Sequence, residues 1–466
     1  MLNNDRLQKG IYYIYFQTLF STVLKRLYIA IFLIFFLSLC TYSQSGFRFS
    51  GGKEKETLRF RFINNLIIIP VEVNGVELSF VLDTGVNKPI LFNLTDSDSL
   101  EVKNVEEIYI RGLGEGDPIR AFKSRGNRFK LKHYIYNNDQ DLYIVLDEGI
   151  NFSPRIGFPI HGIIGFDLFK DFVVEINYVQ KFLRLYDPGT YRYKPCRKCE
   201  FFDLDFIQNK PYIDAVADME KKDGIPVKLL IDSGSSDALW LFEDASKAIE
   251  VPEKYFEDFL GRGLSGSIYG KRSRVKNLHI GGFVLNQAKV AFPDSVSVKY
   301  IDLGGRNGSL GAEVLKRFNV IFDYRNKKIS LKKNGKFKEP FKYNMSGIEL
   351  QHNGIRLVKE LESNIHGIVK DDENVHGGVK ILLNERYKLS LHPAFEVAEI
   401  REKSPAAEAG LKKGDVIVSV NGKPTYRHSL QEVAEMLKEA EGKNIRLLVE
   451  RDGLMLRFFF QLRKVL

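Results

Sequence analysis

Two short motifs in the chain place an acidic residue, a hydroxyl and a glycine at the end of an apolar run. Residues 80–85 read Phe-Val-Leu-Asp-Thr-Gly, and residues 229–234 read Leu-Leu-Ile-Asp-Ser-Gly. A carboxylate at the end of an apolar strand is costly to bury alone, and a glycine two positions later permits a tight turn. The hydroxyl between them can brace the loop by hydrogen bonding to backbone. Asp83 and Asp232 are therefore the candidates for acid–base chemistry.

The chemistry depends on whether the two loops meet. Carboxylates about 3 Å apart cannot both ionise easily, so they share a proton. One can then take a proton from water while the other gives one to a carbonyl oxygen. This pair would hydrolyse a peptide bond without a nucleophilic serine or cysteine, and we expect no metal and no cofactor. A single loop of this kind would be an ordinary solvated turn.

An internal repeat places one motif in each of two related lobes. Asp232 follows Asp83 by 149 residues. Three further pairs of segments repeat in the same order with offsets of 146 to 151 residues: 163–169 with 309–315, 173–186 with 320–331, and 111–113 with 262–264. Each lobe alternates Val-, Ile-, Phe- and Tyr-rich runs with Gly- and Asn-containing turns, which is typical of β-hairpins. We predict lobes at 57–190 and 203–340, joined by a linker at 191–202.

These residues resemble those of the aspartic proteases, both pepsin-like and retropepsin-like. The resemblance rests on the motifs at 81–85 and 230–234, each followed by a hydrophobic-hydrophobic-Gly segment or its variant, at 163–165 and 309–311. It implies that Asp83 and Asp232 form a catalytic dyad and that the substrates are peptides or proteins. It also implies that Thr84 and Gly85 support one aspartate, and Ser233 and Gly234 the other.

The two motifs differ in the residue that follows the glycine, which is Val86 in the first lobe and Ser235 in the second. A hydroxyl at this position can donate to the carboxylate and favour its charged form. We therefore predict that Ser235 makes Asp232 the more acidic member of the pair.

Glycine-rich segments at 112–116 and 263–267 are candidates for flaps that cover a substrate. The residues concerned are Gly112, Leu113, Gly114 and Gly116 in the first lobe, and Gly263, Leu264 and Gly266 in the second. Plain loops are the alternative for both segments. Tyr269 is either a flap aromatic or a surface tyrosine of a hairpin.

The repeat stops near 340, and a different domain follows at 343–466. Residues 404–415 read Ser-Pro-Ala-Ala-Glu-Ala-Gly-Leu-Lys-Lys-Gly-Asp. This string resembles a bacterial PDZ domain, which is an α+β fold. Ser404 is expected to cap a helix that begins at Pro405. The resemblance implies binding of a C-terminal peptide by strand addition, with Gly347, Ile348 and Leu350 as candidates, upstream of a charged insertion near 363–390. A PDZ domain used only for packing stays open.

The N-terminal 45 residues have the pattern of an export signal. Lys25 and Arg26 precede an apolar run of 13 residues at 27–39, followed by small polar residues. A membrane-spanning helix needs about 20 apolar residues, whereas a signal core needs about 7–15. We predict cleavage between 43 and 46 and export to the periplasm or cell envelope. An uncleaved membrane anchor and a lipoprotein modified at Cys40 remain alternatives. Cys196 and Cys199 form either a local disulfide or two free thiols.

Length, charge and composition narrow the number of domains and the classes of protein that remain possible. A length of 466 residues suggests about three domains at roughly 150 residues each. The net charge of +10 comes from basic residues interleaved with acids, and the sequence has no zinc-finger or RNA-binding signature, so no nucleic-acid partner is expected. The sequence has no HExxH zinc motif, and the segment at 263–266 lacks a suitable histidine for a serine protease.

The fold class predicted is mainly β, with two related protease lobes and a C-terminal PDZ domain. The function predicted is an exported aspartic endopeptidase whose PDZ domain binds substrates or partners. The alternative is a non-catalytic cell-envelope protein that binds peptides on the same scaffold.

Overall fold

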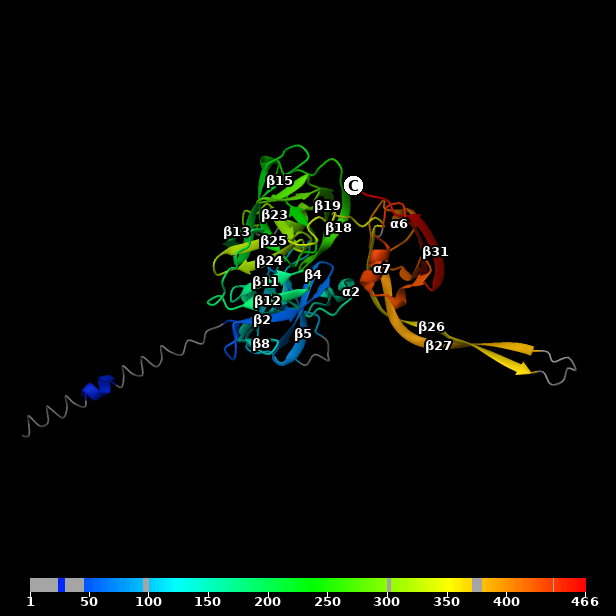
Figure 1. Ribbon diagram of the computed structural model, residues 1–466, viewed down its shortest axis with the longest axis horizontal. Coiled ribbons are helices and arrows are strands. Elements are labelled where there is room, and N and C mark those ends of the chain that lie inside the picture. Colours follow the sequence, from blue (N-terminus) through cyan, green and yellow to red (C-terminus); the bar gives the residue numbers. More distant parts are fainter. Residues whose placement is uncertain (1–23, 30–45, 95–99, 300–302, 371–378, 439) are drawn as a thin grey trace, which may run out of the picture. The chain divides into compact units, whose positions relative to one another are not determined.

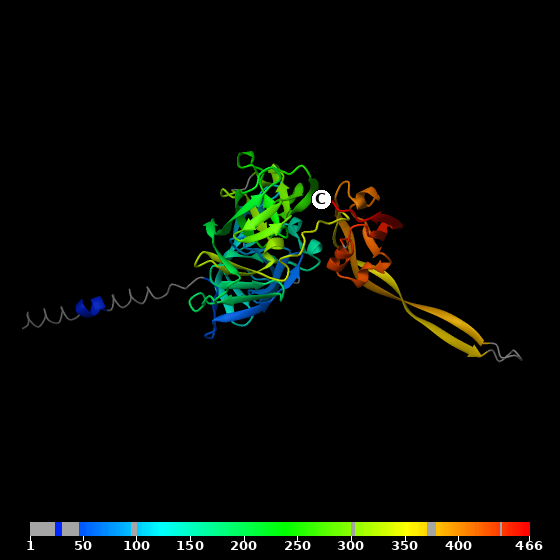
Figure 2. The same cartoon turned by 45° about the horizontal axis from the view of Figure 1, so that its top comes forward.

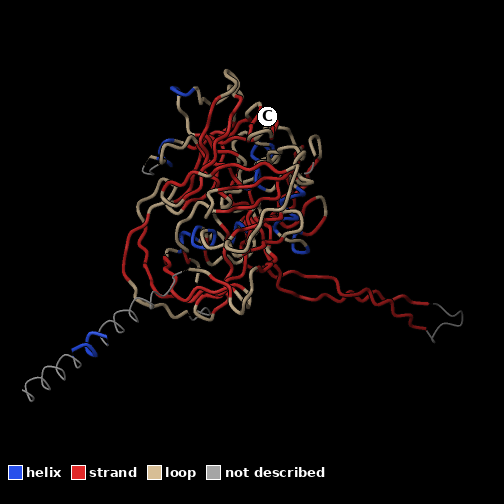
Figure 3. Tube along the Cα trace, turned by 60° about the vertical axis from the view of Figure 1, so that its left-hand side comes forward, coloured by secondary structure: helices blue, strands red, loops and turns tan. Residues whose placement is uncertain are grey.

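The computed structural model describes the whole chain except residues 1–23, 30–45, 95–99, 300–302, 371–378 and 439. The predicted signal segment and Cys40 therefore lie outside the described residues, apart from a helical stretch at 24–29. Among the described residues, no helix has the length and apolar character needed to cross a bilayer. The mainly β class is confirmed, because strands dominate the chain trace and helices are short (Figure 3).

The first lobe is built on a sheet that carries Asp83 at the end of one strand. A tight hairpin at Asn74-Gly75, with φ values of 48° and 95°, joins the two strands that lead to the motif, and this dihedral pattern suits a two-residue β-turn. In the described part of the chain the sheet consists of β1 (Arg48–Phe49), β3 (Arg61–Ile63), β4 (Leu66–Val73), β5 (Val76–Leu82), β6 (Ile90–Leu91), β7 (Glu106–Ile110), β8 (Ile119–Leu131), β9 (Ile135–Ile144) and β10 (Gly162–Ile164).

The second lobe repeats this plan around Asp232 (green to yellow in Figure 1). Its described strands form one sheet with β14 (Asp205–Ile207), β15 (Lys210–Asp218), β16 (Ile225–Asp232), β17 (Leu239–Leu241), β18 (Phe256–Gly263), β19 (Gly266–Arg274), β20 (Asn277–Ile280), β21 (Phe283–Asn286), β22 (Lys289–Pro293) and β23 (Gly308–Gly311). The short helices of the two lobes are η1 (Glu148–Ile150), α2 (Ser153–Ile156), α3 (Phe166–Phe169), η2 (Ala245–Lys247), α4 (Ser295–Val298) and α5 (Ala312–Leu315).

A third sheet contains strands from both lobes and so holds the two lobes together. Its order is β13 (Cys199–Asp203), β25 (Lys328–Lys333), β24 (Phe318–Asp323), β11 (Val173–Asn177), β12 (Phe182–Tyr186) and β2 (Lys55–Arg59). The lobes join where β11 pairs antiparallel with β24, with Ile176 opposite Val320.

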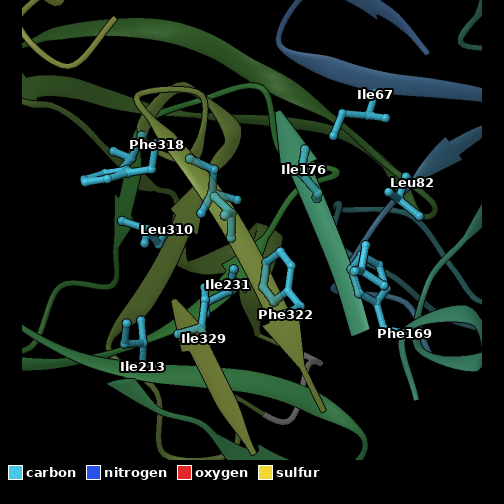
Figure 4. Close-up of a cluster of buried hydrophobic side chains, with 14 of the residues drawn as sticks. Ile67, Leu82, Phe169, Ile176, Ile213, Ile231, Leu310, Phe318, Phe322 and Ile329 are labelled. Atoms are coloured by element: carbon cyan, nitrogen blue, oxygen red, sulfur yellow. The ribbon is translucent and has the colours of Figure 1, made fainter. Parts of the chain in front are cut away.

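The hydrophobic core runs continuously through this junction. Figure 4 shows Phe169 and Ile176 of the first lobe near Phe322 of the second, and the Phe169 and Phe322 rings meet edge to face with centroids 5.2 Å apart. One cluster of buried side chains draws residues from both lobes, so the lobes share this part of the core. Beside this sheet, Cys196 and Cys199 form a disulfide, and β13 begins within the predicted linker.

The C-terminal domain has its own sheet and its own hydrophobic core. Ser404 Oγ accepts from the backbone N–H of Ala407 at 3.3 Å, so it caps a helix that begins at Pro405, as predicted. Ser429 and Glu432 form a capping box at the start of the next helix. The elements are β26 (Ile348–Lys370), β27 (Val379–Ile400), α6 (Pro405–Glu408), β28 (Val416–Val420), β29 (Lys423–Pro424), η3 (Thr425–Arg427), α7 (Leu430–Met436), β30 (Asn444–Arg451) and β31 (Leu454–Gln461).

Residues 363–370 and 379–390 of the predicted insertion belong to two long paired strands, β26 and β27. Strands β26 and β27 pair antiparallel from Ile348 opposite Ile400 to Lys370 opposite Val379. Figure 2 shows the two strands side by side along their length.

Candidate active site

Each aspartate lies at the end of a strand that a second, parallel strand supports: Asp83 directly follows β5, and Asp232 is the last residue of β16. In the first lobe, β10 lies parallel to β5 with Ile164 opposite Leu82, and the backbone N–H of Asp83 donates to the Ile164 carbonyl at 2.9 Å. In the second lobe, β23 lies parallel to β16 with Gly311 opposite Asp232. The hydrophobic-hydrophobic-Gly segment of each lobe therefore packs directly beside the motif strand, which holds both aspartate loops in equivalent positions.

The hydroxyls of Thr84 and Ser233 tie the two loops together across the lobe boundary. Thr84 Oγ1 donates to the Ile231 carbonyl at 2.6 Å and accepts from the Ser233 N–H at 3.0 Å. Ser233 Oγ donates to the Leu82 carbonyl at 2.8 Å and accepts from the Thr84 N–H at 3.1 Å. Both side chains are fully buried. Each hydroxyl thus braces the loop of the opposite lobe.

The carboxyl groups of Asp83 and Asp232 hydrogen-bond to each other at this junction. Gly85 N–H donates to Asp83 Oδ1 at 2.7 Å, and Gly234 N–H donates to Asp232 Oδ1 at 3.1 Å. A Cβ on Gly85 would lie 3.1 Å from Asp83 Oδ1 and 3.5 Å from Asp232 Oδ1, and a Cβ on Gly234 would collide with the Asp83 carboxyl. At position 234 glycine is needed because the opposite carboxyl occupies the space of a side chain, whereas at position 85 a Cβ would crowd the carboxyl of its own loop.

The surroundings of the two carboxyls are unequal. Burial, followed by the charge of Asp232, raises the pKa of Asp83 to about 8. Burial also raises the pKa of Asp232, but the positive charge of Arg306 and the backbone N–H groups of Ser235 and Gly234 oppose this rise. Their mutual hydrogen bond raises the pKa of Asp83 and lowers that of Asp232. Asp83 is therefore the member that keeps the shared proton.

The two glycine-rich segments meet each other. Strands β18 and β19 form a hairpin whose tip is Leu264-Ser265, with Gly263 opposite Gly266. The loop between β7 and β8 contacts this tip through three hydrogen bonds: Gly112 N–H to Ser265 Oγ at 3.1 Å, Ser265 N–H to the Leu113 carbonyl at 3.0 Å, and Gly116 N–H to the Ser265 carbonyl at 2.7 Å.

The leucine at each tip packs against the opposite lobe. Leu113 packs against the cluster of Trp240, Leu260 and Ile268 in the second lobe. Leu264 packs against a cluster in the first lobe that includes Val81 and Ile90. Tyr269 does not reach the tip: it lies on β19 opposite Phe259, with its ring 5.6 Å from the Phe259 ring and 42% of its surface exposed.

Comparison with known proteins agrees with this geometry. Residues 219–314 match the model of the aspartyl protease family, and residues 396–451 match that of the PDZ domain. The chain carries an aspartyl protease domain and a PDZ domain. The curated proteins that match include Rho GTPase-activating protein 21-A of Xenopus laevis and Rho GTPase-activating protein 21 of Xenopus tropicalis. Each is 33% identical over 95 residues, which is 20% of this chain and 5% of the relative's length.

One expectation about this aspartyl protease domain needs correction. Ser235 was expected to lower the pKa of Asp232 through its hydroxyl, but the contact to Asp232 comes from its backbone N–H. The hydrogen bonds of the described residues include none from the Ser235 hydroxyl to the dyad. Because a backbone N–H is present whatever the side chain, the acidity of Asp232 does not depend on a serine here.

Arg306 is the residue at the protease site that sequence reasoning missed. It is 8% exposed, and its Nε and Nη1 have no hydrogen-bond partner in the described chain. Its positive charge is the largest influence that lowers the pKa of Asp232. The corresponding position of the first lobe, at the 146-residue offset, is Ile160. A position-by-position comparison of the two lobes, looking for a charged residue in one that is apolar in the other, could have identified Arg306.

The candidate ligand residues of the PDZ domain lie at the start of β26. Gly347 has φ of +80°, and a Cβ there would collide with Ser404. Ile348 and Leu350 are 3% and 7% exposed and belong to the core of the PDZ domain. Their side chains are therefore structural, and a strand-adding peptide would use the backbone of this segment. Among the described residues, no group of three or more His, Cys, Asp or Glu side chains could hold a metal ion.

Proposed function

We propose that this chain is an aspartic endopeptidase in which Asp83 and Asp232 hydrolyse peptide bonds. The observation that supports this most is the meeting of two half-buried carboxyls from different lobes, with the Asp83 carboxyl lying directly against Gly234 of the opposite loop. Desolvation and the charge of Asp232 raise the pKa of Asp83 to about 8. Such a pair holds one proton wherever Asp83 is protonated and Asp232 is charged, which is the state that general acid–base catalysis by a carboxyl dyad requires. The aspartyl protease match over 219–314 includes Asp232.

The asymmetry of the dyad assigns the roles. Asp232 is charged and takes a proton from the attacking water, whose oxygen forms a bond to the carbonyl carbon. Asp83 is neutral and donates its proton to the carbonyl oxygen. The tetrahedral intermediate then collapses as the C–N bond breaks: the amine nitrogen takes up the proton held by Asp232, and Asp83 recovers a proton from a hydroxyl of the intermediate, which becomes the carboxylic acid product. The paired tips at 112–116 and 263–267 cover the substrate during these steps.

The PDZ domain gives this protease a second site for peptides, at the start of β26. We place the protein in the periplasm or cell envelope because of the signal pattern in its first 45 residues. Retention of that segment as an anchor and lipidation at Cys40 are the two competing outcomes.

The test is cleavage of a mixed peptide library between pH 3 and 7, with and without pepstatin. The variants are Asp83→Asn and Asp232→Asn, and the control is Asp214→Asn, which changes an aspartate with a 79% exposed side chain on β15. We expect cleavage by the wild type and the control only, with unchanged melting temperatures. Cleavage that persists in Asp232→Asn contradicts the dyad. Peptide binding without cleavage by the wild type favours the non-catalytic scaffold.

A further inference from the structure

The side chain of Asp171 is a half-buried carboxylate that lies beside Gly46, the first residue of the compact unit 46–466. The backbone N–H of Phe47 donates to Asp171 Oδ2 at 2.7 Å. The preceding residue, Gly46, has φ of +136°, and a Cβ on it would lie 2.8 Å from Asp171 Oδ2 and 3.1 Å from Oδ1. Glycine is needed at position 46 because the carboxylate lies directly against its Cα.

Among the described residues, Asp171 forms no direct ion pair with a side-chain cation. The two nearest lysines both pair with another carboxylate: Lys88 and Lys170 contact Asp167 at 3.1 Å and 2.9 Å. Within the described residues, no ion pair involves Asp171, and its hydrogen bond is the one from Phe47. Burial, only partly offset by that bond and by the lysine charges, raises the pKa of Asp171 to about 6. Within the described part of the chain, the carboxylate is thus left without a cation in direct contact.

The sequence next to this carboxylate has the pattern of a signal cleavage site. Ser43 and Ser45 stand three and one residues before the bond between Ser45 and Gly46, and small residues at these two positions mark signal peptide cleavage. Hydrolysis of this bond consumes one water and leaves a carboxylate on Ser45 and an ammonium group on Gly46. The new charge would form on the residue that already touches Asp171.

We propose that Asp171 is a docking site for the ammonium group of Gly46, created by cleavage between Ser45 and Gly46. The inference rests on the proposed export of the chain and goes beyond its proposed activity. The segment that follows is already anchored: Phe47 is 4% exposed and packs edge to face on Phe129, and β1 pairs with β9. The ion pair would hold the new N-terminus against the loop that follows α3.

The docking site lies in the part of the first lobe that supports the dyad. Asp171 follows α3, and α3 follows Gly165, whose Cα lies against the Asp83 carbonyl. The ion pair therefore adds a contact to a segment that packs beside the catalytic loop.

The test is expression of the full chain in an exporting bacterium, followed by mass spectrometry of the mature N-terminus and measurement of how fast its amine is methylated. We expect the mature chain to begin at Gly46. An ordinary α-amino pKa is about 8, and a carboxylate partner that raises it by one unit slows methylation about tenfold at neutral pH. Asp171→Asn is expected to restore the fast rate, whereas the control Asp214→Asn leaves it slow.

A different start residue, a retained leader, or an amine that reacts equally fast in wild type and Asp171→Asn would overturn the proposal. If Asp171→Asn does not fold, the wild-type amine is compared with the same amine in urea, where the pair is broken. An equal rate in the two conditions also overturns it. If Asp171→Asn restores fast methylation and still cleaves peptides, the docking of the N-terminus and the proposed peptidase activity are tested independently of each other.

Discussion

Thr84 and Ser233 exchange hydrogen bonds as a reciprocal pair, in which each hydroxyl accepts the other residue's backbone N–H, at 3.0 and 3.1 Å. Each hydroxyl also donates to a carbonyl of the opposite lobe, at 2.6 and 2.8 Å. The aspartates precede these residues directly in the chain. The distance between the carboxyls is therefore fixed by bonds between the lobes.

Replacing Thr84 by Val should weaken this junction. The methyl group fills the same space, but the Ser233 N–H and the Ile231 carbonyl lose a partner in a fully buried position. Each unsatisfied buried group costs about 1–3 kcal/mol, so we expect a lower midpoint in urea unfolding and slower peptide cleavage. Thr84→Ser keeps the hydroxyl and should stay near wild type. Equal stability of Thr84→Val and Thr84→Ser would contradict the bracing role.

Replacing Arg306 by Met should shift the acidic limb of the pH–rate profile. Arg306 opposes the rise in the pKa of Asp232, and Asp232 must be charged to accept a proton from water. Without the guanidinium, Asp232 becomes protonated at a higher pH, so kcat/KM should begin to fall at a higher pH as acid is added. Arg325→Met removes an exposed arginine and should leave the profile unchanged.

Ser235→Ala is the companion to that experiment. Because the backbone N–H of Ser235 contacts Asp232, this variant should keep the wild-type acidic limb. An upward shift in Ser235→Ala together with none in Arg306→Met would reverse our account of why Asp232 is the more acidic member.

A side chain at position 114 should separate the two tips. A Cβ on Gly114 would lie 2.5 Å from the carbonyl carbon and 2.6 Å from the carbonyl oxygen of Ser265. We expect Gly114→Ala to lower kcat/KM several-fold, because open tips admit water to the site. Gly75→Ala is the control, since Gly75 also has a positive φ but has nothing within 4 Å of its Cβ position. Equal effects of both variants on kcat/KM would mean that backbone strain, and not tip contact, is responsible.

The PDZ domain should depend on the pairing of Asp415 with Arg451. Asp415 is 1% exposed, and its two oxygens accept from Arg451 at 2.6 and 2.7 Å. Since Arg451 is partly exposed, we expect Asp415→Asn to cost about 1–3 kcal/mol, seen as faster hydrogen exchange in β28 and β30. Glu408→Gln breaks an exposed pair with Arg463 and should cost no more than about 1 kcal/mol. Unchanged exchange in Asp415→Asn would contradict this role.

The strands that carry the dyad were predictable because their signals are local. An apolar run into Asp-Thr-Gly, and the same pattern 149 residues later, predicts two equivalent turns, and the cap at Ser404 likewise follows from adjacent residues. These features depend on short stretches of sequence, which composition and spacing describe well.

The contacts that define the site were not predictable in the same way. The position of Arg306 next to Asp232 depends on how the segment before β23 packs, and no local pattern specifies it. The reciprocal contact of Leu113 and Leu264 requires two loops from different lobes to meet. The error at Ser235 arose because a side-chain hydroxyl can be read from sequence, whereas the direction of a backbone N–H cannot.

The most direct test of the central claim is the pH dependence of peptide cleavage by wild type, Asp83→Asn and Asp232→Asn, measured beside Asp214→Asn. Our account predicts a bell-shaped profile for the wild type and the control, because cleavage needs one proton on the pair. Both dyad variants should lose activity by several orders of magnitude while keeping the wild-type fold. Cleavage by either dyad variant at a rate near that of the wild type would contradict the account.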